Sequence, residues 1–391
     1  MKRKVLILGT RGIPGNHGGF ETFAERLSLY LVEQGWDVTV YCQEDYSNGK
    51  KIQRQKWQGI NLIHIPCKNN GALWSILFDF KSTLHALNES GVVLVFGYNT
   101  AIFSAFYRLK QRVTLTNMDG MEWWREKWNG IQKSWLFLNE RCGVFFSDCI
   151  IADHPRIADY YVDGGVKREK IATIPYGTEA VMKPDEQLLQ PYNLARESYA
   201  LVIARPEPEN SILEIVAAFS RQKRGYKLVV LGRYSPEEIS YHEKVLAAAS
   251  DEVEFVGGIY DKNVVDALRY YARIYVHGHT VGGTNPSLVE ALAAGTPVLA
   301  QNNHFNSWVA GEGSAYFSDE EECAREFVRL LDNSEALTAM RKASFDRYRE
   351  KFADNQDLKA YENLLLSFAN QDNSTSSLAA PIKKKWVREQ Q

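Results

Sequence analysis

The sequence lacks several motifs that mark common classes of nucleotide-binding and hydrolytic enzymes. It has no Asp-x-Asp pair, the usual carboxylates that hold a divalent metal against the diphosphate of a nucleotide sugar. It also has neither a G-x-x-x-x-G-K-[ST] phosphate loop nor a G-x-S-x-G nucleophile elbow. A phosphate bound by this chain would therefore be met by backbone amides and arginine, and we expect no metal and no cofactor.

Cysteine and long apolar runs are also scarce. The five cysteines are odd in number and show no C-x-x-C spacing, which excludes a disulfide framework and a zinc knuckle and favours a reducing cytoplasm. The basic start and the short apolar run Val5–Leu8 fall well below the length of a signal peptide. Because no stretch approaches the ~20 apolar residues of a membrane span, any membrane contact is expected to be peripheral.

The composition is that of a globular protein, with 45% hydrophobic and 24% charged residues. At roughly 150 residues per domain, the 391 residues predict two or three domains. The net charge of −2 argues against a nucleic-acid partner. Up to residue 184 there are 23 Lys and Arg against 18 Asp and Glu, and after it 23 against 30, so the halves carry about +5 and −7.

Short apolar runs alternate with amphipathic segments and predict two successive parallel α/β units. The clearest helical spacing is that of Phe20, Phe23, Ala24, Leu27 and Leu31. The expected strands are Val5–Leu8, Val38–Tyr41, Leu62–Ile65, Val92–Phe96, Val113–Thr116 and Cys149–Ala152, then Ala200–Ile203, Leu228–Leu231, Val253–Val256, Ile274–Val276 and Val298–Ala300. Two doubly wound domains bind ligands at the carboxyl ends of their strands and would face a common cleft.

We expect an amino-terminal domain over residues 1–180 and a second domain over residues 181–352. A last amphipathic helix falls within 353–370, and a polar, then basic tail follows over 371–391. The tail is interpreted as solubilising disorder, with contact to a membrane surface or a partner as the alternative.

A glycine-rich loop, Gly9–Glu21, follows the first predicted strand. Its glycines permit sharp turns and close approach of a ligand, and the helix starting near Phe20 offers unpaired N–H groups. The spacing is not G-x-G-x-x-G, so dinucleotide binding is only weakly supported, and a purely structural loop is the alternative.

A second glycine-rich segment, Gly282–Pro297, predicts a short helix whose amino terminus points at the cleft. Asn285 is a suitable N-cap, Pro286 a suitable first residue, and Gly295 would end the helix. Gly282 and Gly283 would admit a phosphate to the amides of Thr284 to Ser287, and Glu290, one turn further, could accept two hydrogen bonds from a ribose diol. The alternative is an ordinary capped helix with a solvated glutamate.

Arg205 directly follows the first strand of the second domain. An arginine at a strand end can clamp phosphate oxygens with two parallel hydrogen bonds. The alternative is a surface arginine paired with Glu207 or Glu209.

The segment from Asn117 to Trp128 follows another strand. Asp119 and Glu122 are candidate acid, base or hydroxyl-binding carboxylates, and the tryptophans around Trp123 suit stacking on sugars, a lipid interface or core packing. Basic and aromatic residues nearby could rest on anionic lipid, or could form a solvated basic face. They are Arg108, Lys110, Arg112, Arg125, Lys127, Lys133 and Trp135.

With these residues the chain resembles the two-domain GT-B glycosyltransferases of family 4, over residues 1 to about 368. It is more narrowly similar to a bacterial polysaccharide group often described as rhamnosyltransferases. The segments that carry the resemblance are Gly9–Glu21, Asp119–Trp123, Arg205–Asn210 and Gly282–Glu290. In that family a final helix crosses back onto the amino-terminal domain.

The resemblance implies a donor site in the second domain and an acceptor site in the first. The donor residues would be Arg205, Gly283, Thr284, Asn285, Ser287 and Glu290, with Glu290 on the ribose. The acceptor residues would be Gly18, Gly19, Glu21, Glu122 and Trp123, and the catalytic residues Arg205 and Asp119. Two positions depart from the family: its first E-x7-E glutamate falls at Gly282, and its phosphate-binding lysine falls at Asn210.

The implied activity is metal-independent sugar transfer with retention of configuration. The sugar would be L-rhamnose from dTDP-rhamnose, and the acceptor a lipid-diphosphate-linked oligosaccharide at the inner face of the cytoplasmic membrane, in bacterial surface polysaccharide synthesis. The alternatives are an NAD(P)-dependent dehydrogenase with Glu44 on the ribose, a non-catalytic protein that binds sugar nucleotides or glycans, and a sugar-nucleotide epimerase.

Overall fold

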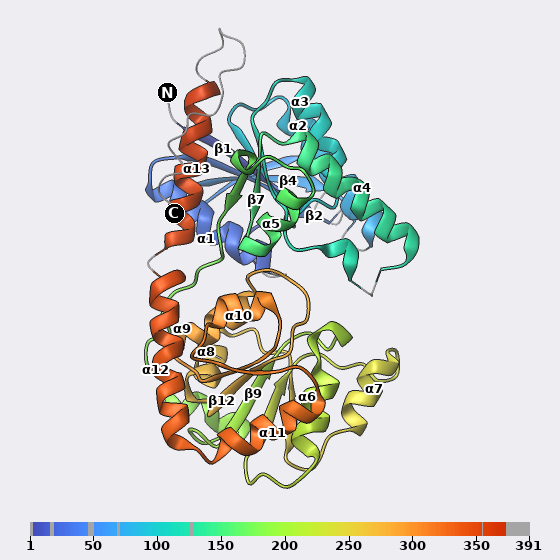
Figure 1. Cartoon of the computed structure of the whole chain (residues 1–391). Helices are drawn as coiled ribbons and strands as arrows, with labels where there is room; N and C mark the ends of the chain where they lie inside the picture. The colour runs from blue at the N-terminus through green and yellow to red at the C-terminus, as the bar shows by residue number, and fades with distance from the viewer. Residues whose placement is uncertain are drawn as a thin grey trace. The chain divides into compact units, whose positions relative to one another are not determined.

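The computed structural model describes residues 3–15, 19–45, 51–68, 71–125, 128–353 and 355–372. It divides into two compact units. The amino-terminal domain contains the chain up to Pro175 and the residues from Asp357 on, and the carboxyl-terminal domain contains Tyr176–Gln356. Figure 1 shows that each domain is a sheet flanked by helices.

The amino-terminal domain is built on a sheet of order β3-β4-β2-β1-β5-β6-β7-β8. Its neighbours pair in parallel except β3 and β4, which form an antiparallel pair. The inner strands are buried because helices cover both faces of a parallel sheet. The strands are β1 (Lys4–Leu8), β2 (Asp37–Glu44), β3 (Gln53–Trp57), β4 (Ile60–Pro66), β5 (Val92–Phe96), β6 (Thr114–Asn117), β7 (Cys149–Ala152) and β8 (Ile171–Thr173).

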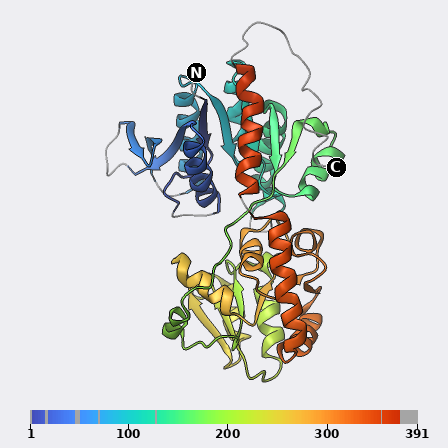
Figure 2. The same ribbon diagram turned by 90° about the vertical axis from the view of Figure 1, so that its left-hand side faces the viewer.

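The last helix of the chain belongs to the amino-terminal domain. Tyr361 of α13 is buried against the rings of Phe23 and Phe96, and Glu362 accepts hydrogen bonds from Tyr30 and Trp36. Figure 2 shows α13 lying along this domain, in red. The helices are α1 (Gly19–Glu33), α2 (Ala72–Ala86), α3 (Ser104–Leu109), α4 (Gly130–Phe146), α5 (Pro155–Asp163) and α13 (Gln356–Asp372).

The carboxyl-terminal domain is built on a second parallel sheet, of order β11-β10-β9-β12-β13-β14. Its strands are β9 (Tyr199–Ile203), β10 (Lys227–Leu231), β11 (Val253–Gly257), β12 (Ile274–His277), β13 (Val298–Gln301) and β14 (Ala315–Phe317). Its helices are α6 (Ile212–Ser220), α7 (Ser240–Ala247), α8 (Lys262–Tyr271), α9 (Pro286–Ala293), α10 (His304–Ala310), α11 (Glu320–Leu331) and α12 (Ser334–Lys351).

The predicted fold class, two doubly wound α/β domains, is confirmed. Three strands were not expected from the sequence, namely β3, β8 and β14. The boundary between the domains falls at Tyr176, a few residues before the expected 180, and the helix expected within 353–370 runs from Gln356 to Asp372. Most of the tail expected over 371–391 lies outside the described residues.

Candidate functional site

The strand order of the carboxyl-terminal sheet reverses between β9 and β12. Chain order runs outward from β9 through β10 to β11 on one side, and from β12 through β13 to β14 on the other. Open parallel sheets bind ligands at such a switch point, outside the carboxyl ends of the two strands. The loops that follow β9 and β12 contain Arg205 and Gly282–Asn285 respectively, so both predicted phosphate-binding segments border the same switch point.

Hydrogen bonds tie these two loops together. Thr280 donates from its amide and its hydroxyl to the Glu209 carbonyl, at 2.9 and 3.0 Å. The Ser287 hydroxyl lies 3.4 Å from the Ile203 carbonyl, at the end of β9. The Arg205 loop and the segment around the start of α9 are therefore in contact within this domain, and their convergence on one phosphate stays a prediction.

Gly278 and Asn210 show how closely the two backbones approach. A Cβ added to Gly278 would lie 2.1 Å from the Asn210 carbonyl oxygen, which excludes any side chain there. Asn210 is buried, and its amide group donates to the Arg205 carbonyl at 2.8 Å. The position where the related family carries a phosphate-binding lysine is thus occupied here by a residue that braces the loop.

Arg205 itself extends into solvent. Its side chain is 69% exposed, and one guanidinium nitrogen lies 3.7 Å from a Glu207 carboxylate oxygen. The alternative pairing with Glu207 is therefore observed. Exposed pairs of this kind are worth ~0 to 1 kcal/mol, so Glu207 does not prevent Arg205 from binding an anion.

The predicted ends of α9 are confirmed, and they change which amides can meet a phosphate. Asn285 caps the helix by accepting a hydrogen bond from the Ser287 amide at 3.0 Å, and Pro286 has no N–H. The Leu288 amide donates to the Asn285 carbonyl. The Ser287 amide, which the sequence assigned to phosphate, is thus engaged in capping the helix. The amides that remain as candidates for phosphate binding are those of the loop before the helix. A Cβ on Gly282 would meet nothing within 4 Å.

Glu290 has a partner that the sequence did not predict. Arg269 of α8 forms a salt bridge with the Glu290 carboxylate and lies 3.4 Å from the Ser287 hydroxyl. The Arg269 side chain is nearly buried, whereas Glu290 remains partly exposed. The salt bridge therefore fixes the direction of Glu290 and leaves part of its carboxylate accessible. Arg269 stands in an ordinary amphipathic helix, so the sequence contained no signal for it.

A row of aromatic rings leads along β12 to the same edge. The Tyr275 hydroxyl lies 2.7 Å from the Ser287 hydroxyl, and burial raises the Tyr275 pKa to about 12. His277 is buried, and its ring stacks on that of His279 with centroids 4.3 Å apart. Neither ring nitrogen of His277 has a hydrogen-bond partner among the described residues. Burial first, and then His279, hold the His277 pKa well below its ordinary value.

The glycine-rich loop after β1 is held by glutamates of α1. Glu21 is buried and accepts a hydrogen bond from the Arg11 amide at 3.0 Å, and Glu25 accepts one from the Gly15 amide at 2.6 Å. These contacts stabilise the loop, which favours the structural alternative for Glu21. Gly19 is exposed at the start of α1. Gly18, the other predicted acceptor residue here, lies outside the described residues.

Asp119 lies just past the carboxyl end of β6, within a chain of buried contacts. The Asn117 side chain accepts a hydrogen bond from the Asp119 amide at 2.9 Å and donates to the Tyr361 hydroxyl at 2.7 Å. Asn117 and Tyr361 are both fully buried, whereas Asp119 is partly exposed. Helix α13 therefore helps to set the backbone of Asp119, which has a left-handed φ of 53°.

Glu122 and Trp123 contact their own domain. The Glu122 carboxylate pairs with Arg125 at 2.7 Å and accepts a hydrogen bond from Trp128 at 3.2 Å. The Trp123 indole donates to the buried Glu140 at 2.7 Å, and burial raises the Glu140 pKa. These contacts favour a structural role for both residues, with Glu140 as the partner that the sequence did not reveal.

A row of apolar side chains on α4 faces solvent. Ile131, Leu138 and Phe145 are seven residues apart and therefore lie on one side of the helix, and all three are exposed, Ile131 by 84% and Phe145 by 73%. Arg108 of α3 pairs with Asp148, just beyond the end of α4. We call these three side chains and Arg108 the α4 face. Among the described residues, no helix combines the length and hydropathy needed to cross a membrane.

Comparison with known proteins identifies the second domain. Residues 186–347 match the family described as Glycosyl transferases group 1, and residues 2–179 match a family described as a domain of unknown function (DUF1972). No curated protein matches the chain.

Solved structures share the fold of the whole chain. A sucrose-phosphate synthase from Thermosynechococcus elongatus is 16% identical, with a TM-score of 0.77 over 95% of this chain and 100% of that one. An α,α-trehalose 6-phosphate synthase from Burkholderia multivorans is 12% identical, with a TM-score of 0.69 over 97% and 99%. HepE from Anabaena, in complex with UDP, is 13% identical, with a TM-score of 0.69 over 95% and 100%.

The chain is a glycosyltransferase with the GT-B fold. The alternative interpretation of the chain as an NAD(P)-dependent dehydrogenase is therefore wrong. Glu44, which that alternative placed on a ribose, lies at the end of β2 with its carboxylate 3.0 Å from a ring nitrogen of His64.

Proposed function

We propose that the chain transfers a sugar from a nucleotide sugar to a hydroxyl acceptor, with retention of configuration and without a metal. The observation that carries this proposal is the pair of loops at the switch point of the carboxyl-terminal sheet. The loop with Arg205 and the loop before α9 are tied together by the Thr280 and Ser287 hydrogen bonds. One cationic side chain and one open, glycine-rich backbone thus border a single binding position.

The proposed chemistry is stabilisation of a departing diphosphate. The bond from the anomeric carbon to the donor phosphate oxygen breaks, and the acceptor oxygen forms the new bond on the same face. Arg205 and the loop amides of Gly283, Thr284 and Asn285 stabilise the negative charge that grows on the leaving group. A preorganised donor of this kind is typically worth about 3 to 4 kcal/mol of barrier. The acceptor proton passes to the leaving phosphate or to Asp119.

Glu290 is proposed to orient the nucleotide through its ribose. Its salt bridge with Arg269 holds the carboxylate in one orientation. This reduces the entropic cost of ordering the Glu290 side chain when the ribose binds. Asp119 is proposed to act on the acceptor in the amino-terminal domain. Asp119 is partly exposed, and the buried Asn117 side chain accepts a hydrogen bond from its amide.

The acceptor is proposed to be a lipid-diphosphate-linked glycan, reached at the inner face of the cytoplasmic membrane. The α4 face supports this, because its exposed apolar side chains suit the headgroup region of a bilayer, and Arg108, paired with Asp148, is its one basic residue. The finer assignment, L-rhamnose from dTDP-rhamnose in surface polysaccharide synthesis, rests on the sequence resemblance.

The central test is a panel of nucleotide sugars incubated with one lipid-diphosphate-linked acceptor, with the anomeric configuration of the product read by NMR. We expect turnover with dTDP-rhamnose, a retained anomer, and full activity in EDTA. Loss of turnover on chelation with recovery in Mg²⁺ would refute the metal-free mechanism. Nucleotide-sugar binding without any turnover would support a non-catalytic binding protein instead.

Membrane contact is tested by sedimentation with anionic vesicles of phosphatidylglycerol. Phe145→Ser should reduce the bound fraction, with a roughly tenfold weaker partition coefficient from the lost apolar burial. Val328→Ser is the matched control, because Val328 is an exposed apolar residue on α11. Equal loss in both variants would contradict a specific role for the α4 face.

A further inference from the structure

A cavity of about 610 Å³ lies in the carboxyl-terminal domain, away from the switch point. It adjoins the segment just before β9 and the ends of α8 and α9, which places it at the amino edge of the sheet. Arg205 and the loop before α9 lie at the carboxyl edge. The residues that line the cavity are Val181, Met182, Lys183, Arg196, Glu197, Tyr270, Tyr271, Ala294, Gly295, Thr338, Arg341, Lys342 and Phe345.

The cavity combines apolar walls with a basic rim. Aromatic and aliphatic side chains form much of the wall, and Met182 and Phe345 remain exposed at its mouth. Four cations, Lys183, Arg196, Arg341 and Lys342, accompany a single lining carboxylate, Glu197. Lys342 pairs with Asp346 at 2.9 Å, so the excess of positive charge next to the apolar surface comes from Lys183, Arg196 and Arg341.

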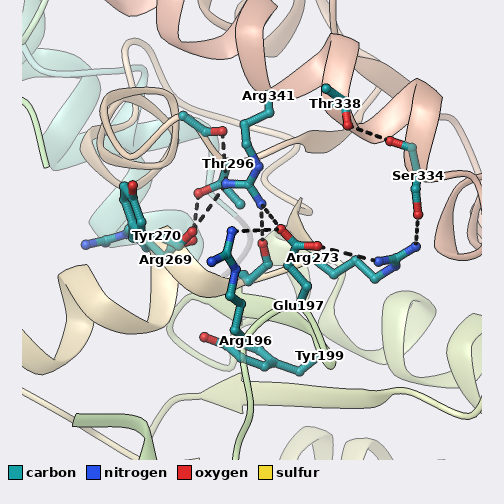
Figure 3. Close-up of polar contacts among 12 residues, drawn as sticks. Arg196, Glu197, Tyr199, Arg269, Tyr270, Arg273, Thr296, Ser334, Thr338 and Arg341 are labelled. Carbon is teal, nitrogen blue, oxygen red and sulfur yellow. Dashed lines mark hydrogen bonds and ion pairs between the residues drawn. The ribbon is translucent and has the colours of Figure 1, made fainter. Parts of the chain in front are cut away.

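Glu197 does not neutralise this charge. Figure 3 shows three guanidinium groups directed at its carboxylate, those of Arg196, Arg341 and Arg273. The closest N–O distances are 3.9, 3.8 and 4.0 Å respectively. Charge-assisted hydrogen bonds are shorter, at about 2.7 to 2.9 Å, so these are loose pairs shared among three cations.

Two of the three arginines are fixed by the backbone. Arg341 donates to the carbonyls of Tyr270, Ala272 and Gly295, at the ends of α8 and α9, and Arg273 donates to the Leu331 carbonyl and the Ser334 hydroxyl. Cations at the carboxyl ends of helices are stabilising, so these two have a structural role. Arg196 differs, because its side chain is 62% exposed and can turn toward a ligand.

We propose that this cavity binds a small soluble organic phosphate, a dianion with an aromatic or otherwise apolar body. The excess of cations over carboxylates suits a dianion. One guanidinium group can donate two parallel hydrogen bonds to two oxygens of a phosphate. The tyrosines and Phe345 match an apolar body, and the volume lies within the range of small-molecule pockets. The cavity is open to solvent on one side, so a lipid headgroup would present the same phosphate, and competition by vesicles separates the two sources.

This second site is separate from the donor site. Helix α9 contributes Ala294 and Gly295, just past its carboxyl end, to the cavity, whereas the loop at its amino end belongs to the switch point. Its eight residues span about 12 Å, so one small molecule cannot occupy both ends. The proposal is therefore independent of the donor sugar and of the acceptor.

The test is calorimetric titration of the full chain with phenyl phosphate, in the presence of saturating dTDP, the nucleotide of the proposed donor. We expect binding of one equivalent that dTDP does not displace, and at least tenfold weaker binding of inorganic phosphate, which lacks the apolar body. Arg196→Glu should weaken phenyl phosphate at least tenfold. Arg325→Glu is the matched control, because Arg325 is also 62% exposed, lies on α11 and pairs with Glu321, and it should change affinity less than twofold.

Lys183→Glu is a second variant at an exposed rim position, and circular dichroism checks that each variant is folded. The proposal is overturned if phenyl phosphate does not bind, if dTDP displaces it, or if both rim variants bind it as the wild type does. Competition by phosphatidic acid vesicles, lost in Arg196→Glu, would overturn the assignment to a soluble ligand. No competition by vesicles would support it.

Discussion

The carboxyl edges of the two sheets use their polar residues differently. In the carboxyl-terminal domain Arg205 extends into solvent and Gly282 opens onto free space, while internal bonds hold the backbone around them. In the amino-terminal domain Glu21, Glu122 and Trp123 are all engaged with their own domain. The edge of the carboxyl-terminal sheet thus has exposed groups on an internally bonded backbone. At the edge of the amino-terminal sheet, most of the predicted polar residues contact their own domain.

Under the proposed function, the edge of the carboxyl-terminal sheet binds the donor and the edge of the amino-terminal sheet binds the acceptor. A diphosphate makes the same demands in every donor, so fixed charges and amides can be preorganised for it. Acceptors vary, and the proposed acceptor-side group, Asp119, is partly exposed and held through the buried Asn117. The comparison therefore predicts large effects from single substitutions at the donor edge and smaller ones at the acceptor edge.

The largest effect is expected at Arg205. Arg205→Ala removes the exposed cation at the switch point and should lower kcat/KM about a hundredfold or more, which corresponds to ~3 kcal/mol of transition-state stabilisation. Steady-state kinetics with the best nucleotide sugar measure this. Arg221→Ala, which removes a partly exposed arginine paired with Glu320 elsewhere in the domain, is the control and should change the rate little. A change within threefold at Arg205 would refute its assigned role.

Glu290 tests whether the donor edge also binds the nucleoside. Glu290→Gln keeps a hydrogen-bond acceptor for Arg269 but loses the charge, and it should weaken binding of the free nucleoside diphosphate about tenfold, or ~1.4 kcal/mol. Calorimetry measures the affinity, and thermal denaturation separates this loss from the stability lost at the buried Arg269. Unchanged affinity with a lower melting temperature would make Glu290 a purely structural partner.

Much of the donor edge could be predicted from the sequence because its signals are local. An Asn-Pro pair followed nine residues later by glycine specifies a capped helix, and an arginine after an apolar run specifies a position at a strand end. The bond from Asn285 to the Ser287 amide follows from the same capping rule, and it removes one of the amides that the sequence assigned to phosphate.

The remaining features depend on contacts between distant segments. Strand β3 is exposed along most of its length, so its residues carry no apolar pattern, and pairing with β4 creates the strand. Arg269 and Glu140 could not be recognised from the sequence as partners of Glu290 and Trp123. These contacts join segments that are distant in the chain and form only in the folded structure. Glu21 was predicted to contact an acceptor, but in the structure its carboxylate accepts a hydrogen bond from the Arg11 amide. The sequence gives no sign of this contact, because the two residues are ten positions apart in the chain.

Tyr361 tests the proposed acceptor edge through the hydrogen bonds that lead from it to Asp119. Tyr361→Phe removes the hydrogen bond that holds Asn117, and Asn117 in turn holds the Asp119 amide. A buried hydrogen bond is worth about 1 kcal/mol, so kcat should fall roughly fivefold while KM for the donor stays unchanged. Asn117→Ala should reproduce this split, since it breaks the same chain. An equal loss in stability with unchanged kcat would limit α13 to holding the domain together.

The smallest effect concerns His277, a buried polar side chain of the donor edge with no hydrogen-bond partner among the described residues. Its pKa is held well below the ordinary ~6.5, so the folded state keeps it neutral while the unfolded chain takes up a proton as the pH falls. Stability from this group is therefore complete above pH ~6.5 and declines as the pH falls below it. His277→Phe should remove that part of the decline in urea denaturation of the full chain. If His277→Phe kept the same pH dependence as the wild type, His277 would be able to ionise in the folded protein, and the donor edge would be less dry and less rigid than the comparison requires.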